Sequence, residues 1–163
     1  MKYDESYFED RQKIEPHHPL MVEAWLKLFN PQNVLDFGCG SGRLVKLFND
    51  MGVVCDGYDP NVPEFSKKRA KGKYDLVICI DTLEHIKESE LPEMLMYIKM
   101  LTKRNVLFSI CCAGDSNYYL DDTHVTFKSK AWWIAKLSEY FTNVRPAPPL
   151  WPYHWQFFIG EVR

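Results

Sequence analysis

The chain has 163 residues, of which 46% are hydrophobic and 26% are charged, and its formal net charge is −2. This length and composition predict a single domain, residues 1–163, with a core of its own. The balanced charge excludes a large basic field for a long nucleic acid. The sequence has neither a signal-like segment nor a long apolar run, which favours a cytoplasmic protein without a membrane partner.

The N-terminal residues 1–19 are rich in acids and aromatics and show no clear period. They are expected to form an arm outside the first regular element. From Leu20 to Asn30 the apolar residues recur at helical spacing, and Pro31 follows directly. Because a proline disfavours helical backbone before it, a helix over residues 20–30 is predicted.

Three glycines at alternate positions mark the most informative stretch. Residues 34–42 read Val-Leu-Asp-Phe-Gly-Cys-Gly-Ser-Gly, and apolar residues at helical spacing follow. The pattern predicts a buried strand, a glycine loop and a helix. A helix N-terminus behind a loop without side chains is expected to offer unpaired N–H groups and the positive end of the helix dipole to a ligand.

The spacing of these glycines argues against a nicotinamide dinucleotide. The dinucleotide-binding fingerprint reads Gly-x-Gly-x-x-Gly. Counted from Gly38, its third glycine falls where this chain has Arg43. A second strand is predicted over residues 53–58, and Asp59 and Pro60 follow it directly. Asp59 follows the loop by about 20 residues, and an acid in that place accepts the hydroxyls of a ribose. Asp59 is therefore the predicted ribose ligand.

Residues 73–81 contain the continuous apolar run, residues 76–80, expected of a central parallel strand, and Thr82-Leu83-Glu84-His85 follows. Ligands in open α/β sheets bind beyond the carboxyl ends of the strands. The sequence therefore predicts that Asp36, Asp59 and Asp81 meet at one edge of the sheet.

The remainder of the chain predicts alternating helices and strands. They are a helix over 88–103, a strand over 105–111, a polar aromatic loop over 112–125, a helix over 127–141 capped by Ser129, and an antiparallel pair over 143–145 and 156–163. Met residues in the first of these helices are expected to fill the core.

The glycine loop after Asp36 and the phrase from Asp81 to His85 resemble two motifs of the class I S-adenosylmethionine-dependent methyltransferases. The resemblance implies a Rossmann-like three-layer α/β sandwich with a mostly parallel sheet and an antiparallel C-terminal strand. Only residues 60–73 separate Asp59 from the next strand. The family's third strand is therefore expected to be reduced or absent, with adenine left to Phe65 or to the end of the next strand.

The same resemblance implies S-adenosylmethionine as cofactor and an N-terminal arm, residues 1–19, folded across the cofactor cleft. The implied cofactor-binding residues are Asp36, Gly38, Cys39, Gly40, Asp59, Pro60, Asp81, Thr82 and Leu83.

Methyl transfer to oxygen requires alignment of the two reactants and removal of a proton. Histidine is the side chain most ready for that proton near neutral pH. His124 and His85 are the predicted catalytic residues, since both follow strands on the cofactor side. The predicted acceptor is a small polar molecule, a sugar or another metabolite hydroxyl, because a nucleic acid would need several phosphate contacts from Lys or Arg.

A metal-assisted RNA 2′-O-methyltransferase is the alternative. Asp81, Glu84, His85 and His124 resemble the metal-binding set of the small-RNA 3′-terminal 2′-O-methyltransferases, Glu-x-x-Glu-His with a later His. Asp81 is one methylene shorter than the expected Glu, and Leu-Glu-His also occurs in methyltransferases without metal. No metal ligand is therefore assigned. A non-catalytic S-adenosylmethionine-binding module is a further alternative.

Overall fold

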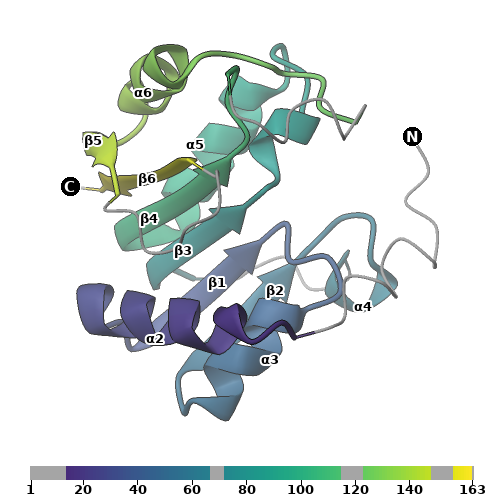
Figure 1. Cartoon of the computed structure of the whole chain (residues 1–163), viewed down its shortest axis with the longest axis vertical. Helices are drawn as coiled ribbons and strands as arrows, with labels where there is room; N and C mark the ends of the chain where they lie inside the picture. Colours follow the sequence, from purple (N-terminus) through teal and green to yellow (C-terminus); the bar gives the residue numbers. More distant parts are fainter. Residues whose placement is uncertain (1–13, 67–71, 115–122, 148–155, 163) are drawn as a thin grey trace.

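The computed structural model describes residues 14–66, 72–114, 123–147 and 156–162. In this part of the chain six strands form one sheet in the order β2-β1-β3-β4-β6-β5 (Figure 1). The strands are β1 (Asn33–Phe37), β2 (Val54–Tyr58), β3 (Tyr74–Ile80), β4 (Thr102–Ile110), β5 (Thr142–Pro146) and β6 (Gln156–Glu161). β6 is antiparallel to β4 and β5, and the pairs among β1 to β4 are parallel.

Helices cover both faces of the sheet, so the molecule has three layers (Figure 1). They are α2 (His17–Phe29), α3 (Arg43–Asp50), α4 (Pro63–Ser66), the 3-10 helix η1 (Leu83–His85), α5 (Leu91–Leu101) and α6 (Lys130–Ser138). One core cluster joins α2 and α3 to the sheet, and the other joins α5 and α6 to its opposite face. No helix in the described part is both long and apolar enough to cross a membrane.

The central strand β3 is buried, and residues 76–80 make up a continuous apolar run within it. In β3 all residues from Tyr74 to Cys79 are buried, as predicted for a strand covered on both faces. Its parallel neighbours are β1 and β4, so the carboxyl ends of β1, β2 and β3 come together at one edge. The predicted Rossmann-like sandwich with an antiparallel C-terminal strand is confirmed.

The sheet ends on β2, with no strand among the described residues between Tyr58 and Tyr74. The predicted loss of the third strand is confirmed for these residues. In its place the short helix α4 brings the ring of Phe65 against Gly42 and Gly57. A Cβ at Gly42 would lie 2.5 Å from that ring, so the glycine backbone makes room for the aromatic side chain.

Several predicted boundaries differ from the structure. α2 begins at His17, so residues 17–19 belong to a helix rather than to the predicted arm, and Pro19 is tolerated in its first turn. α5 ends at Leu101 and β4 starts directly at Thr102. The predicted cap of α6 is confirmed, because Ser129 Oγ accepts the N–H of Trp132 at 3.2 Å.

Candidate active site

A cavity of about 300 Å³ opens at the carboxyl ends of β1, β2 and β3. Its wall includes the glycine loop between β1 and α3 and the residues that follow β2 and β3. The predicted cofactor-binding residues that line it are Asp36, Gly38, Cys39, Gly40, Asp59, Pro60, Asp81 and Thr82. The volume lies at the lower end of the range for small-molecule sites.

The glycine loop is held tightly against its neighbours. Gly38 has φ +82°, and a Cβ at this position would overlap the side chain of Thr82. The N–H groups of Gly38 and Cys39 both donate to the carbonyl of Tyr58, at 2.7 and 3.2 Å. The N–H of Gly40 donates to Asp59 Oδ2 at 3.0 Å. These three hydrogen bonds tie the glycine loop to the residues at the end of β2.

Two acids that line the cavity, Asp36 and Asp59, lie close enough for their charges to interact. Asp36 is buried, and burial raises its pKa to about 7, with the charge of Asp59 adding to the rise and Arg43 opposing it. Asp36 is therefore about half protonated at neutral pH. Asp59 Oδ1 accepts the N–H of Asn61 at 2.8 Å, so backbone amides orient both of its oxygens.

Asp81 follows β3 in a left-handed conformation with φ +49°, which is uncommon for a residue with a side chain. Ser109 forms two hydrogen bonds with Asp81. The N–H of Asp81 donates to the carbonyl of Ser109 at 3.0 Å, and Ser109 Oγ donates to Asp81 Oδ1 at 2.5 Å. Strained backbone of this kind persists only when its surroundings fix it, and it gathers at functional sites.

One part of the cavity wall is apolar, and sequence reasoning missed it. Tyr58, Ile86 and Met94 line the cavity. Tyr58 packs against Phe37 and Tyr97, with ring centroids 5.0 and 5.9 Å away. Met94, which was expected to fill the core, packs against the core cluster of α5 and also lines the cavity. The available signal was the position of Tyr58, directly before Asp59 at the end of a strand.

Two predicted contacts lie elsewhere. Leu83, predicted to bind the cofactor, is fully buried in the core cluster with α5, because the turn of η1 directs it away from the cavity. Phe65, considered for the adenine, packs on Gly42 and Gly57 and does not line the cavity.

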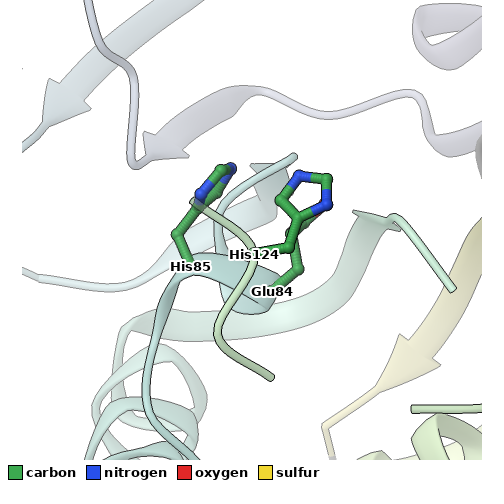
Figure 2. A group of neighbouring side chains, drawn as sticks. All are labelled: Glu84, His85 and His124. Carbon is green, nitrogen blue, oxygen red and sulfur yellow. The ribbon is translucent and has the colours of Figure 1, made fainter. Parts of the chain in front are cut away.

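The two predicted catalytic histidines lie side by side. The ring centroids of His85 and His124 are 4.8 Å apart with an interplanar angle of 66°, and Glu84 lies beside them (Figure 2). His85 also lines the cavity. Its Nδ1 contacts Thr123 Oγ1 at 2.8 Å and the Thr123 carbonyl at 3.3 Å, which fixes the ring.

Glu84 organises this corner of the molecule. Its side chain is fully buried, and its Oε1 accepts the N–H of Cys111 at 2.8 Å. Its carbonyl accepts the N–H groups of Val125 and Thr126, both at 2.9 Å. Thr126 Oγ1 donates to the carbonyl of Ile86 at 2.5 Å. The segment that carries His124 is therefore tied to η1, which carries His85.

The set that resembled an RNA methyltransferase metal site is brought together only in part. Glu84, His85 and His124 offer ligand atoms that all lie within 4.8 Å of one another. Asp81 is not in this group, and its carboxylate bonds to Ser109 instead. Residues 1–13, with most of the predicted arm, and residues 115–122 of the loop before His124 lie outside the described residues.

Comparisons with known proteins give the family. The family model described as a methyltransferase domain matches residues 7–143. The chain therefore belongs to the class I S-adenosylmethionine-dependent methyltransferases, as the resemblance of its motifs predicted. The sequence has no match among curated proteins.

Solved structures share the fold at low identity. Human N-acetylserotonin methyltransferase, in complex with SAM, matches with 15% identity and a TM-score of 0.75, over 96% of this chain and 55% of that one. A SAM-dependent methyltransferase from Archaeoglobus fulgidus matches with 16% identity and a TM-score of 0.69, over 97% of this chain and 100% of that one. The methyltransferase domain of the bacterial protein CtHen1 matches with 19% identity and a TM-score of 0.64, over 90% of this chain and 98% of that one. This chain thus spans about half the length of the human enzyme.

Proposed function

We propose that this chain transfers the methyl group of S-adenosylmethionine to a hydroxyl of a small polar acceptor, such as a sugar or another metabolite. The observation that carries the proposal is the position of His85, which lines the same cavity as Asp36 and Asp59 and contacts His124. A cofactor held by the acids would thus have imidazole groups beside it.

The cavity accommodates each part of the cofactor in the proposed arrangement. Asp36 and the glycine loop take the charged amino-acid end, and Asp59 accepts the ribose hydroxyls. The apolar wall of Tyr58, Ile86 and Met94 receives the adenine, because a flat ring gains from burial against apolar groups. In this arrangement side chains from β2, α5 and the segment after η1 supply the adenine contacts.

The charge of the cavity supports a small acceptor. Among the described residues that line it, Arg43 is the only Lys or Arg. The whole chain carries 20 basic and 22 acidic residues. A bound RNA would need several basic side chains along its phosphates, and its affinity would fall steeply with salt.

The acceptor class is tested by turnover. The purified full chain is incubated with methyl-labelled S-adenosylmethionine and separate pools of sugars, other hydroxylated metabolites and short RNAs. Label in a sugar or metabolite is the expected result. Label confined to RNA would overturn the small-acceptor proposal. Cofactor binding without label in any pool would favour a non-catalytic binding module.

Replacing His85 with Ala is expected to lower turnover by about 100-fold or more, because general acid–base groups contribute on that scale. Cofactor affinity should change by less than about threefold, since acids and the glycine loop are proposed to supply it. Steady-state rates and calorimetric titration with S-adenosylhomocysteine measure the two effects separately. Unchanged turnover would exclude His85 from the chemistry.

A further inference from the structure

We propose that the side chain of Asn49 closes the open edge of the sheet and thereby keeps β2 from pairing with β2 of a second copy of this chain. β2 lies at one end of the sheet, and no strand among the described residues bonds to its outer side (Figure 1). Such an edge presents backbone groups with which another chain can pair. β2 also begins with Val54, an apolar β-branched residue that is 63% exposed and favours strand pairing.

The backbone groups at the open edge follow from the alternation of the strand. The carbonyl of Tyr58 accepts the N–H groups of Gly38 and Cys39, which follow β1. The backbone groups of Tyr58 are therefore directed towards β1. Successive residues of a strand direct their N–H and C=O groups to opposite neighbours. Within β2, Cys55 and Gly57 are thus the residues whose backbone groups lie at the open edge.

Asn49 pairs with Cys55 as a residue of a neighbouring strand would. Asn49 Oδ1 accepts the N–H of Cys55 at 3.2 Å, and Asn49 Nδ2 donates to the carbonyl of Cys55 at 3.0 Å. A side-chain amide carries the donor and the acceptor that a peptide group offers. Both backbone groups of Cys55 are therefore satisfied without a strand partner.

The position of Asn49 on α3 holds its amide in place. Asn49 lies in the last turn of α3, and its Nδ2 also donates to the carbonyl of Val45 at 2.8 Å. The short connection from α3 to β2 is held as well, because the N–H of Gly52 donates to the carbonyl of Asn49 and the N–H of Val53 to that of Phe48, both at 3.0 Å. A side chain fixed by these contacts blocks the edge with little further loss of entropy.

Blocking one residue is sufficient because β2 is short. The strand has five residues, of which two direct their backbone groups outward. With Cys55 occupied by Asn49, at most Gly57 is left to pair with an incoming strand. One residue does not make a ladder, so the amide of Asn49 prevents extension of the sheet at this edge.

Hydrogen exchange at Cys55 tests the cap directly. Asn49→Leu removes the donor and the acceptor but keeps a branched side chain of similar size and a good helix former. At low protein concentration, the N–H of Cys55 should exchange at least about tenfold faster in this variant, because its hydrogen bond is lost. Asp50→Asn, which changes the exposed neighbour paired with Lys46, is the matched control and should exchange as the parent does.

At higher concentration, Asn49→Leu is expected to associate through the opened edge. Sedimentation velocity should show a concentration-dependent dimer of this variant, while the parent and Asp50→Asn keep their sedimentation coefficients. Pairing of β2 with β2 of the second copy would restore protection at Cys55 and add protection at Gly57. Association without protection at these two amides would place the interface elsewhere and overturn the proposal.

A second variant guards against misfolding of the first. Asn49→Ala removes the amide with a smaller side chain, and the same faster exchange at Cys55 is expected. A cooperative thermal transition shows that each variant is folded. Equal exchange at Cys55 in the parent and both variants would contradict the cap, and faster exchange without any dimer would contradict its role against association. Neither measurement uses the cofactor, so both outcomes are independent of the proposed methyl transfer.

Discussion

Replacing Asp36 with Asn is expected to stabilise the folded chain above neutral pH while weakening its affinity for the cofactor. Burial raises the pKa of Asp36 to about 7, above the value of 3.8 for an exposed aspartate. A group whose pKa is raised on folding contributes stability that is present below about pH 4 and lost as pH rises through 7. An asparagine does not ionise, so the Asn variant keeps this stability as pH rises. At pH 8 its free energy of unfolding should exceed that of the parent chain by up to about 4 kcal/mol.

Cofactor binding should respond in the opposite direction. The proposed partner of Asp36 is the charged amino-acid end of the cofactor, and a charge-assisted contact contributes about 1.5 to 3 kcal/mol. The Asn variant should therefore bind about 10- to 100-fold more weakly at pH 8. The affinity of the parent chain should fall as pH drops below 7, because Asp36 becomes protonated, and the variant should show a flatter profile.

Thermal unfolding and calorimetry at several pH values measure both effects. Asp75→Asn is the control, since Asp75 is also buried but lies at the opposite edge of the sheet, bonded to Gln32 and Lys103. These contacts hold the pKa of Asp75 below its usual value, so its variant should lose stability at neutral pH and keep its affinity. An Asp36→Asn variant with parent affinity would remove Asp36 from the cofactor site.

Replacing Gly38 with Ala is expected to abolish detectable cofactor binding. The backbone at Gly38 has φ +82°, which costs about 1 to 2 kcal/mol for a residue with a Cβ. The added Cβ would also overlap the side chain of Thr82, which lines the cavity. The loop must shift to relieve the overlap, and the shift displaces the contacts of Gly38 and Cys39 with Tyr58.

Gly52→Ala separates the two costs. Gly52 has the same φ of +82°, but a Cβ there would have no atom within 4 Å. Both variants should lose stability from the backbone conformation, and only Gly38→Ala should lose the cofactor. Calorimetry with S-adenosylhomocysteine and thermal unfolding of both variants decide the matter. Equal cofactor affinity in the two variants would show that the loop tolerates the change.

The fold was predictable wherever one strong local pattern decided an element. The apolar run of β3 and the glycine loop both specify their structure, because a strand buried on two faces and a turn at positive φ each restrict the residue types that fit. The short segment after Asp59 similarly indicated that no further strand forms among the described residues between β2 and β3. The junction of α5 and β4 was not predictable, since residues 102 and 103 continue the chain without any loop signal.

The acids of the site were predictable, but their surroundings were not. Asp36, Asp59 and Asp81 end neighbouring strands, so the topology alone brings them together. The apolar wall depends on packing between β2 and α5, and no local pattern distinguishes Met94 in the cavity from a methionine in the core. The contact of His85 with His124 depends on hydrogen bonds between Glu84 and residues 125 and 126, which are long-range in sequence.

Calorimetric titration of the purified chain with S-adenosylhomocysteine and S-adenosylmethionine tests the central claim most directly. We predict that both compounds bind to one site per chain, and that Asp36→Asn and Gly38→Ala weaken or abolish the binding while Gly52→Ala retains it. The absence of heat with either compound, together with binding of a nicotinamide dinucleotide, would contradict the account.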